Sequence, residues 1–498
     1  MTEARPANAG PYGRLLRHSF VYGLGFVGTS ALALLLTPLY TRFIAPDGYG
    51  RLRLVGITLQ LVSIAASLGL VESLFRFFYQ QADRAEARAL TSTIFVSLVV
   101  SLALFALPLF ALAGPLAALV LDDAAFAGYF RIAAATLVVS GLTAFVMALL
   151  RIEERSGWYV ALSIAQIGGA LSLNIFFVVV LAAGVEGVLW ATLAANVFAF
   201  VLAAPYLARR IAPTFDRRLF AEALSFGGPL VPASLAAYLI SSSSLYFLRA
   251  FSTFDETGVF SLALQFGSAI SILVVTPFDM TWSPMKYKLA QEPGAGTVYG
   301  NVLVYFALVV LWSVIGLAAL IDDAMVIAID ARYRSAALYI GAIGLCHALF
   351  GVYRIVSLGL DLAKKTSRRA AIIVFSLAVN LGLNFLLAPP FGAWGAVAAL
   401  AGAYLTMTVA AYLAAQKVYP VPYPLRRLIA PIAAAGVHYG LARLVETGSP
   451  VGNLGLRTAI VLLYPATLWV LGVFTPPERR QIAAFVTALA AGRRGGRA

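Results

Sequence analysis

The sequence has few charged residues. They make up 12% of its 498 residues, whereas hydrophobic residues make up 61%. Soluble domains are usually about 25% charged and about 45–50% apolar. The mean hydropathy of +0.89 shows the same excess of apolar residues. Because so many apolar side chains stay out of water only in a bilayer, the composition excludes a soluble enzyme, a disordered chain and a coiled coil.

Residues that carry redox and metal chemistry are scarce. The one cysteine, Cys346, allows no intramolecular disulfide. The three histidines, His18, His347 and His438, suggest no metal-binding cluster, so we expect neither a metal site nor another cofactor. The sequence contains no Walker A, HExxH or GxSxG motif, which argues against ATP hydrolysis and against the hydrolytic chemistry of those motifs.

One glycine pattern imitates a nucleotide-binding site. Gly23, Gly25 and Gly28 spell G-x-G-x-x-G, with Asp47 further along the chain. A dinucleotide site requires a preceding strand and a βαβ unit, whereas this pattern falls within an apolar run. Close packing between helices is therefore the better interpretation.

Long apolar runs are abundant. A membrane-spanning helix needs roughly 20 mostly apolar residues. We expect fourteen such spans, near residues 19–42, 53–75, 91–113, 127–150, 159–182, 188–208, 221–248, 257–280, 298–321, 336–360, 370–388, 394–415, 427–445 and 457–474. The connections between them are short, so function is expected to reside within the helix bundle.

The basic residues follow the expected topology. The net charge is +14, from 36 Lys+Arg and 22 Asp+Glu. When the N-terminus is placed in the cytoplasm, most basic residues fall in the inner segments, as the positive-inside rule requires. This bias predicts an even number of spans and two cytoplasmic termini. It also explains the positive charge without a nucleic-acid partner.

Two parts of the chain repeat each other. The pattern Asp-x2-Gly-x3-Leu occurs at residues 47–54 and again at 255–262, and a Leu-Asn pair precedes Gly-x2-Gly in both halves. The second echo consists of Asn174, Gly184 and Gly187 in the first half and of Asn384, Gly392 and Gly395 in the second. Two six-helix units of one orientation form a parallel repeat about an axis along the membrane normal, which favours a transporter over a channel or a membrane enzyme.

The repeat predicts the domain organisation. We expect a cytoplasmic N-terminal tail at 1–18, an N-lobe at 19–212, a C-lobe at 213–416, two further spans at 417–475 and a basic cytoplasmic tail at 476–498. The expected fold is an all-α polytopic membrane protein with two six-helix lobes and two extra C-terminal helices.

Charged residues near or within the spans are candidates for a substrate cavity. An ionised side chain at membrane depth costs at least ~2.5–3.5 kcal/mol on insertion scales, so it usually faces a cavity or a partner. Arg354, deep in the span 336–360, is the strongest candidate. Glu72 and Arg76 share one helix face at i,i+4 spacing, which fits either an ion pair near the inner interface or a cavity role.

Three further arginines have two interpretations each. Arg42, Arg131 and Arg249 lie near the outer ends of predicted spans, where an arginine either lines the cavity or extends to the membrane interface. Arg249 also follows a polar run at 241–244, whose serines suit a hydrated face or close helix packing.

Helix breakers mark candidate hinges and an ion site. Pro229 and Pro232 follow two glycines in the seventh predicted span, which predicts a bend or hinge. Pro277 interrupts the eighth, and Asp279 follows it. Asp279 either caps a broken helix or binds a coupling cation.

Several short motifs resemble one transporter family. Residues 37–50, TPLYTRFIAPDGYG, resemble the end of the first helix in polysaccharide flippases of the MOP superfamily, the Wzx-like polysaccharide transport family. SLGL at 67–70, FGGPLVP at 226–232 and WSP at 282–284 resemble later elements of that family in the same order. The resemblance covers about residues 15–425. Relatives often carry an Asp-Arg pair late in the seventh helix, whereas this chain has Ser244 and Leu245, with the arginine displaced to Arg249.

The resemblance implies a V-shaped transporter in the bacterial cytoplasmic membrane. Its two lobes would move a polyprenyl-diphosphate-linked oligosaccharide, a precursor of polysaccharide or of lipopolysaccharide O-antigen, to the outer leaflet by alternating access. Cavity arginines would pair with the diphosphate. An H+ or Na+ gradient or the membrane potential would drive turnover. A glycan polymerase and export machinery are the implied partners.

Three alternatives stay open at this point. A multidrug or cation antiporter of the same superfamily depends on acidic groups in the lobes, whereas the deep charges here are mainly arginines. A membrane glycan polymerase or ligase usually needs a large outer loop, which this chain lacks. A structural subunit of an export complex is the third alternative.

Overall fold

The computed structural model describes residues 36–476 and 478–480, and every regular element within them is a helix. Among these described residues, ten helices are long and apolar enough to cross a membrane, or up to eleven if the bent pair Pro46–Ser67 and Leu70–Gln80 forms one span. The predicted all-α polytopic membrane fold is confirmed. The count of fourteen stays a prediction, because most of the first span, the tail at 1–18, the glycine pattern at 23–28 and most of the tail at 476–498 lie outside the described residues.

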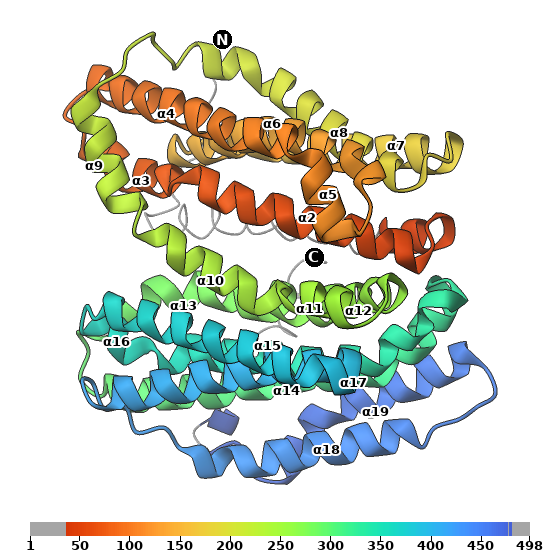
Figure 1. Ribbon diagram of the computed structural model, residues 1–498. Coiled ribbons are helices and arrows are strands. Elements are labelled where there is room, and N and C mark those ends of the chain that lie inside the picture. The colour runs from red at the N-terminus through yellow and green to blue at the C-terminus, as the bar shows by residue number, and fades with distance from the viewer. Residues whose placement is uncertain (1–35, 477, 481–498) are drawn as a thin grey trace, which may run out of the picture.

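The first group of helices, which we name the N-bundle, runs from α2 to α9 (Figure 1). Aspartates cap two of them: Asp83 accepts backbone N–H bonds at the start of α4, and Asp216 does so at the start of α9. The α-helices are α2 (Pro46–Ser67), α3 (Leu70–Phe77), α4 (Arg84–Ala111), α5 (Ala113–Leu121), α6 (Ala127–Ile152), α7 (Ser156–Asn174), α8 (Gly184–Ala208) and α9 (Arg217–Gly227). The shorter elements are η1 (Phe78–Gln80), η2 (Ala124–Phe126) and η3 (Ile175–Val180).

The second group, the C-bundle, runs from α10 to α17. It comprises α10 (Leu230–Ser242), α11 (Ser244–Phe251), α12 (Phe254–Gly267), η4 (Ser271–Val275), α13 (Thr276–Leu289), α14 (Ala295–Ala328), η5 (Ala331–Ala336), α15 (Ala337–Val356), α16 (Leu358–Leu362) and α17 (Thr366–Gln416). The 51-residue α17 is two helices joined at Gly392, whose φ of 53° lies in the left-handed region. Asn380 Nδ2 donates to the carbonyl of Ala399 over 3.2 Å, so the two halves run antiparallel as a hairpin.

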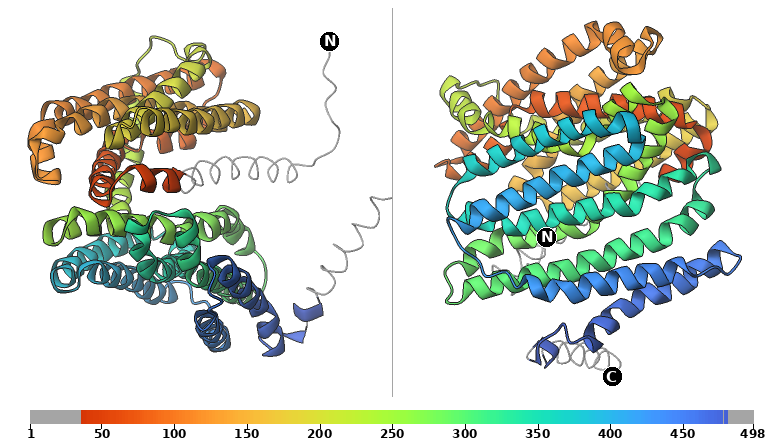
Figure 2. Two further views of the ribbon diagram at one scale, coloured as in Figure 1. Left: turned by 90° about the vertical axis from the view of Figure 1, so that its right-hand side faces the viewer. Right: turned by 60° about the horizontal axis from the view of Figure 1, so that its bottom comes forward.

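The last two helices, α18 (Ile429–Arg443) and α19 (Pro450–Val470), pack on α14, on the side of the C-bundle away from the N-bundle (Figure 2). A short turn, η6 (Leu425–Leu428), precedes them. Near one end of α14, Arg457 pairs with Asp323 at 2.7 Å. Near the other end, Arg427 pairs with Glu478 at 2.9 Å and also bonds to Asn301 of α14. An ion pair at one end and a hydrogen bond at the other therefore fasten α18 and α19 to the C-bundle.

The two bundles meet most extensively where α2 packs against α12. Gly50 of α2 and Gly258 of α12 lie at the centre of this contact. A Cβ at Gly50 would overlap the carbonyl of Phe254, and a Cβ at Gly258 would overlap the carbonyl of Pro46. Each glycine thus faces the carbonyl four residues before the other. Because these glycines are the equivalent positions of the sequence repeat, an approximate two-fold axis passes between them.

The seventh predicted span is broken into three helices. Its first piece, α9, packs on α3 and α4 of the N-bundle, whereas α10 and α11 pack on α17. The break falls at Gly227, Gly228 and Pro229, with Pro232 in the first turn of α10. Gly227 lies against Gly69, which has a φ of 65°. The lobe boundary at 213 and the hinge role of the prolines stay predictions, with the packing change falling at Gly227.

Candidate functional site

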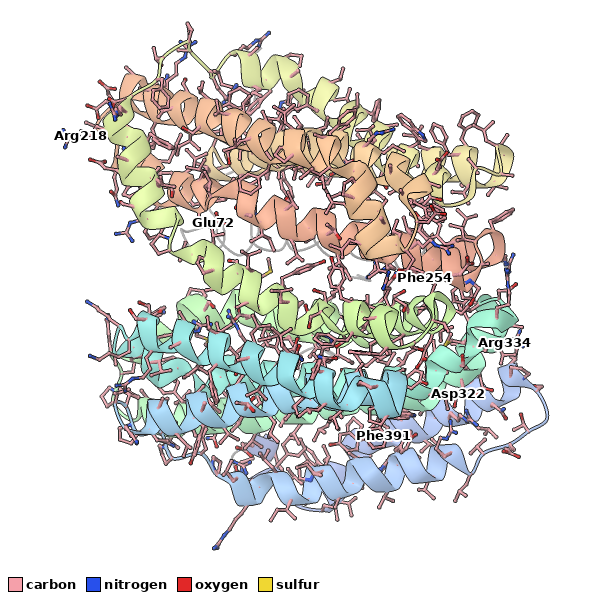
Figure 3. All side chains as sticks on the ribbon, in the orientation of Figure 1. Glu72, Arg218, Phe254, Asp322, Arg334 and Phe391 are labelled. Carbon is pink, nitrogen blue, oxygen red and sulfur yellow. The ribbon has the colours of Figure 1, made fainter. Side chains whose placement is uncertain are left out.

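The two ends of the molecule differ in charge and in how extensively the N-bundle and the C-bundle contact each other there. Figure 3 places Glu72 and Arg218 near one end, and Asp322 and Arg334 at the other. The first end also carries many of the arginines and lysines of the short connections, and we name it the basic end. The opposite end carries the Asp-Asp pairs at 122–123 and 322–323, and we name it the acidic end; contacts between the N-bundle and the C-bundle are extensive there. Among the described residues, α3, α4, α6 and α8 make no comparable contact with α13 to α17.

Side-chain bonds hold the acidic end closed. Arg249 of α11 donates to the carbonyl of Val120 over 3.1 Å and forms an ion pair with Asp122, so it joins the two bundles. Tyr333 of η5 donates to the carbonyl of Ile44 over 2.9 Å. Arg249, a predicted cavity residue, therefore lies at the contact between the bundles in this conformation.

A cavity of about 730 Å³ lies between α2, α7 and α8, with side chains from the C-bundle on one side. Arg53 is the only charged residue among its described lining residues. The cavity also has tyrosines from both bundles, such as Tyr49 and Tyr238. Its amide side chains are Gln60, Gln166, Asn174, Asn196 and Gln265. We name this space the N-cavity.

Arg53 has neither an ion-pair partner nor a hydrogen-bond partner among the described residues, and its Nε is buried. The sequence interpretation assigned Arg53 to an outer segment, because the apolar run begins there. The helix begins earlier, at Pro46, with Asp47 in the first turn. Proline at the start and an acidic first turn are helix-start signals that place Arg53 in the second turn of α2.

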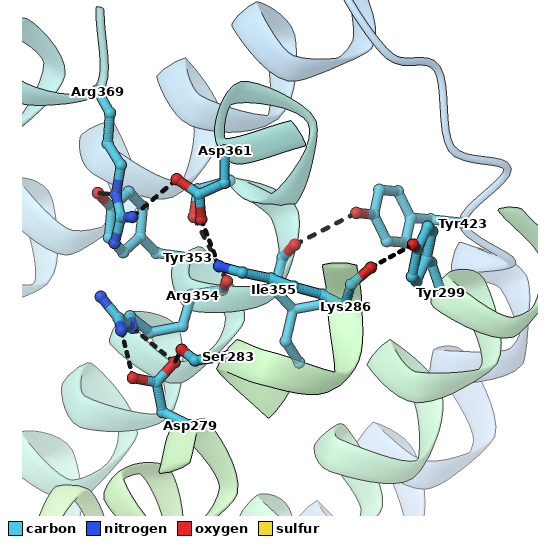
Figure 4. A network of polar contacts seen from close by, with 11 residues as sticks. Asp279, Ser283, Lys286, Tyr299, Tyr353, Arg354, Ile355, Asp361, Arg369 and Tyr423 are labelled. Carbon is cyan, nitrogen blue, oxygen red and sulfur yellow. Dashed lines mark hydrogen bonds and ion pairs between the residues drawn. The ribbon is translucent and has the colours of Figure 1, made fainter. Parts of the chain in front are cut away.

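A smaller cavity of about 280 Å³ lies within the C-bundle, next to α10. Arg354 and Arg369 line it together with His347, and we name it the C-cavity. Arg354 Nε donates to Asp279 Oδ1 over 3.1 Å, and a second contact completes a bidentate ion pair (Figure 4). The structure thus brings together two residues that the sequence singled out separately. About a quarter of each side chain is exposed, at 26% for Arg354 and 23% for Asp279.

A second ion network lies behind this pair. Asp361 accepts from Lys286 at 2.5 Å and from Arg369 at 2.8 Å, and Arg369 also donates to the hydroxyl of Tyr353 (Figure 4). Lys286 and Asp361 are both only 6% exposed. Buried charges require such partners, because an unpaired ion in a low-dielectric interior is costly. The sequence interpretation did not single out Asp361, which lies just after the predicted span 336–360.

The remaining predicted residues lie outside both cavities. Arg42 is exposed at the end of the helix that stops at Phe43, and Arg131 is exposed on α6. Glu72 and Arg76 are exposed and form no ion pair with each other; Arg76 instead lies 4.4 Å from the ring centroid of Phe226. These exposed positions suit side chains that extend to the membrane interface, and the cavity roles of these residues stay predictions.

Pro277 lies in the first turn of α13, directly after the π-helical stretch η4. Asp279 is two residues further on, within the same turn, where its partner is Arg354. Within the described part of the chain, no group of three or more His, Cys, Asp or Glu is arranged to hold a metal ion.

Two helical bundles that meet at one end, with an arginine-lined cavity in each, are the arrangement of a membrane transporter. The family model described as "Polysaccharide biosynthesis protein" matches residues 39–338, which is more than half of the chain. The chain belongs to this polysaccharide biosynthesis family. A search of curated proteins found no match.

Solved structures show the same fold. The chain is similar to the lipid II flippase MurJ in an inward closed conformation, with a TM-score of 0.76, 10% identity, and coverage of 92% of this chain and 99% of that chain. It is also similar to an inward-facing multidrug resistance MATE family transporter, with a TM-score of 0.63, 13% identity and coverage of 78% and 94%. The Vibrio cholerae MATE transporter VcmN in its bent form gives a TM-score of 0.56 at 18% identity, with coverage of 81% and 96%.

Proposed function

We propose that this protein moves a polyprenyl-diphosphate-linked oligosaccharide, a precursor of a cell-surface polysaccharide, across the bacterial cytoplasmic membrane. The observation that carries the proposal is the unpaired Arg53 in the amide-rich N-cavity. A guanidinium inside a membrane protein needs an anionic partner, and none is present among the described residues. The substrate would supply that partner as its diphosphate.

The chemistry of the N-cavity matches both parts of such a headgroup. Arginine presents a planar fork of donors that binds two phosphate oxygens at once. Amide side chains such as Gln60 and Gln166 offer donors and acceptors for sugar hydroxyls. The apolar tail would remain in the bilayer, because moving it through a polar cavity costs hydrophobic free energy.

The charge of the two ends supports loading of the substrate from the cytoplasmic side. We place the basic end in the cytoplasm, with both termini on that side, as the positive-inside rule favours. In this orientation the structure is closed toward the outer leaflet, and the substrate would be loaded from the inner one. Bending at the Gly227–Pro229 break, between pieces of one span that pack on different bundles, would allow the bundles to rock.

The Arg354–Asp279 pair is the site we propose for coupling. An arginine held by a carboxylate is released when that carboxylate takes up a proton or binds Na+, and it is then free to bind a phosphate. Ion uptake at Asp279 would thus bias the C-cavity between a paired state and a substrate-binding state. A glycan polymerase that consumes the translocated product is the implied partner.

The test is transport by purified protein in liposomes. Vesicles carrying a fluorescent polyprenyl-diphosphate oligosaccharide are treated with an impermeant quencher, under imposed H+ or Na+ gradients. We expect movement above that of protein-free vesicles, and a large loss in Arg53→Gln. Arg334→Gln, at an exposed arginine that lines neither cavity, is the matched control. If wild-type protein moves no more lipid than empty vesicles under every gradient, the proposed function is wrong.

The MATE-like fold makes a multidrug or cation antiporter the second candidate function. The charge of the N-cavity argues against it, because a lone arginine repels a cationic drug. Uptake of a fluorescent lipophilic cation into the same liposomes separates the two functions.

A further inference from the structure

A notch lies outside both cavities, at the basic end of the N-bundle, where α7 begins and α8 ends. It has a volume of about 350 Å³. Arg155, Arg209 and Arg210 line it, and no carboxylate is among its lining residues. These arginines directly flank the apolar segments 156–180 and 184–208, so they sit at the level where lipid headgroups meet water.

The three arginines are not equivalent. Arg210 Nε donates to both oxygens of Glu153 at 2.7 Å, and its guanidinium stacks 3.6 Å from the ring centroid of Tyr206. Arg155 and Arg209 have neither an ion-pair nor a side-chain hydrogen-bond partner among the described residues, and both are exposed. The anchored Arg210 and Tyr206 therefore form a fixed wall, while two guanidinium groups remain available for an anion.

The rest of the notch is apolar and faces outward. Trp158 is 58% exposed and Leu202 is 44% exposed, and Pro205 also lines the notch. Tryptophan is enriched at the membrane interface, where its ring meets acyl chains and its N–H meets headgroups. The notch thus offers cations for a phosphate and an apolar surface for the first part of a lipid tail.

The notch differs from the N-cavity in one respect that indicates its ligand. It has no Asn, Gln, Ser or Thr among its lining residues, whereas the N-cavity has five amide side chains. It therefore suits a phosphate without offering amide partners to an oligosaccharide, and its one hydroxyl, that of Tyr206, already donates to Glu153. Basic pockets between membrane helices at the cytoplasmic side are typical sites for anionic phospholipid headgroups.

We propose that this notch binds an anionic phospholipid of the leaflet at the basic end, with its phosphate held by Arg155 and Arg209 and its tail along Trp158. The two arginines favour an anionic lipid over a zwitterionic one, because the positive group of a zwitterionic headgroup offsets the charge of its phosphate. Bound there, the lipid neutralises two exposed guanidinium groups at the end of the α7–α8 helix pair.

The first experiment measures lipid binding by native mass spectrometry of the delipidated full-length protein. Phosphatidylglycerol, phosphatidylcholine and a sugar-free polyprenyl diphosphate are titrated separately. For the double variant Arg155→Gln/Arg209→Gln, we expect the affinity of the tightest phosphatidylglycerol site to fall about tenfold. The control Arg217→Gln/Arg218→Gln removes the same charge at the same end and is expected to keep that site.

A second measurement reports on the notch directly. Phosphatidylglycerol with brominated tails quenches nearby tryptophans, and Trp158 is one of six in the chain. We expect stronger quenching by brominated phosphatidylglycerol than by brominated phosphatidylcholine, and Trp158→Phe should remove that difference. This readout remains informative if the double variant folds poorly.

Three results would overturn the proposal. Equal losses in the two double variants would mean that diffuse positive charge, rather than the notch, attracts the lipid. Persistence of the quenching difference in Trp158→Phe would place the lipid elsewhere. Displacement of phosphatidylglycerol by the sugar-free polyprenyl diphosphate at lower concentration would assign the notch to the transported lipid.

Discussion

The N-cavity and the C-cavity hold arginine in opposite electrostatic states. Arg53 of the N-cavity has no carboxylate partner among the described residues, whereas Arg354 of the C-cavity is held by Asp279. Behind Arg354, two further cations share Asp361. The bundles are related by a repeat, but their charges are not repeated.

This difference suggests a division of labour between the bundles. A free guanidinium binds an anion at once, whereas a paired one binds only after its partner is protonated, displaced or occupied by a cation. Under the proposed function, the N-cavity would capture the diphosphate, and the C-cavity would make a later step conditional on an ion. The predictions below test this contrast.

The largest effect is expected from Arg53→Gln. Charge-assisted hydrogen bonds contribute about 1.5–3 kcal/mol each, so loss of the guanidinium should reduce transport about 10- to 100-fold. Arg53→Lys should restore part of the activity, because it keeps the charge but not the planar fork. Initial rates in the liposome assay measure both. Wild-type rates in Arg53→Gln would show that Arg53 does not bind the substrate. The proposed difference in role between the N-cavity and the C-cavity would then be wrong.

The next effect concerns the contact that closes the acidic end. In Gly258→Ala, the new Cβ overlaps the carbonyl of Pro46, so α2 and α12 must separate. Overpacking costs about 1–3 kcal/mol, and we expect about tenfold faster maleimide labelling of Thr41→Cys, whose parent side chain is buried. Gly56→Ala on α2 has open space around it and is the control. Unchanged labelling would show that the bundles separate elsewhere.

A smaller effect is expected when the C-cavity is made to resemble the N-cavity. Asp279→Asn leaves Arg354 without its ion pair, so binding of a sugar-free polyprenyl diphosphate should tighten. Partly exposed ion pairs contribute about 1 kcal/mol or less, which limits the gain to about fivefold. Titration calorimetry in detergent measures it, with Asp330→Asn as a surface control. Weaker binding in Asp279→Asn would indicate that Asp279 itself contributes to the ligand site.

The smallest effect concerns α18 and α19, which fasten to the C-bundle alone. Burial raises the pKa of Glu478, but hydrogen bonds from Tyr305, the Thr475 backbone and Arg427 outweigh it and lower the pKa to about 2. Because the folded-state pKa lies below the unfolded one, the stabilisation is present above about pH 4.3 and is lost as the pH falls toward 2.

Glu478→Gln should therefore lower the melting temperature by about 2 °C at pH 7 and make no difference near pH 2. Thermal unfolding of wild-type and variant protein across this range is the measurement. Glu446→Gln, near the opposite end of α18, serves as the control. A difference that grows with acidity would mean that Glu478 is not held as its anion.

The sequence predicts the architecture well because the bilayer constrains it so strongly. Apolar runs of spanning length mark most of the observed helices, and the breakers at Gly227 and Pro229 mark a real interruption. The repeated Asp-x2-Gly-x3-Leu pattern marked the contact of the two bundles, since only glycine allows that approach of backbones.

The site was harder to predict, for two physical reasons. The apolar run of the predicted span 53–75 begins at Arg53, so the sequence placed this residue on the outer side of the membrane, although the helix begins seven residues before it. The Arg354–Asp279 pair joins residues 75 positions apart, and nothing local in one sequence indicates which charges meet. Asp361 was overlooked for the same reason, because its partners Lys286 and Arg369 come from two other helices.

The contact of Gly50 with Gly258 has a consequence for how such a chain evolves. If the six-helix unit were a separate subunit, the same glycine would touch its own copy across the axis, as in an isologous dimer. Any substitution there would then change both sides of the interface at once. In a fused chain each side varies alone, so one unit can keep Arg53 without a carboxylate partner among the described residues while the other pairs its Arg354 with Asp279.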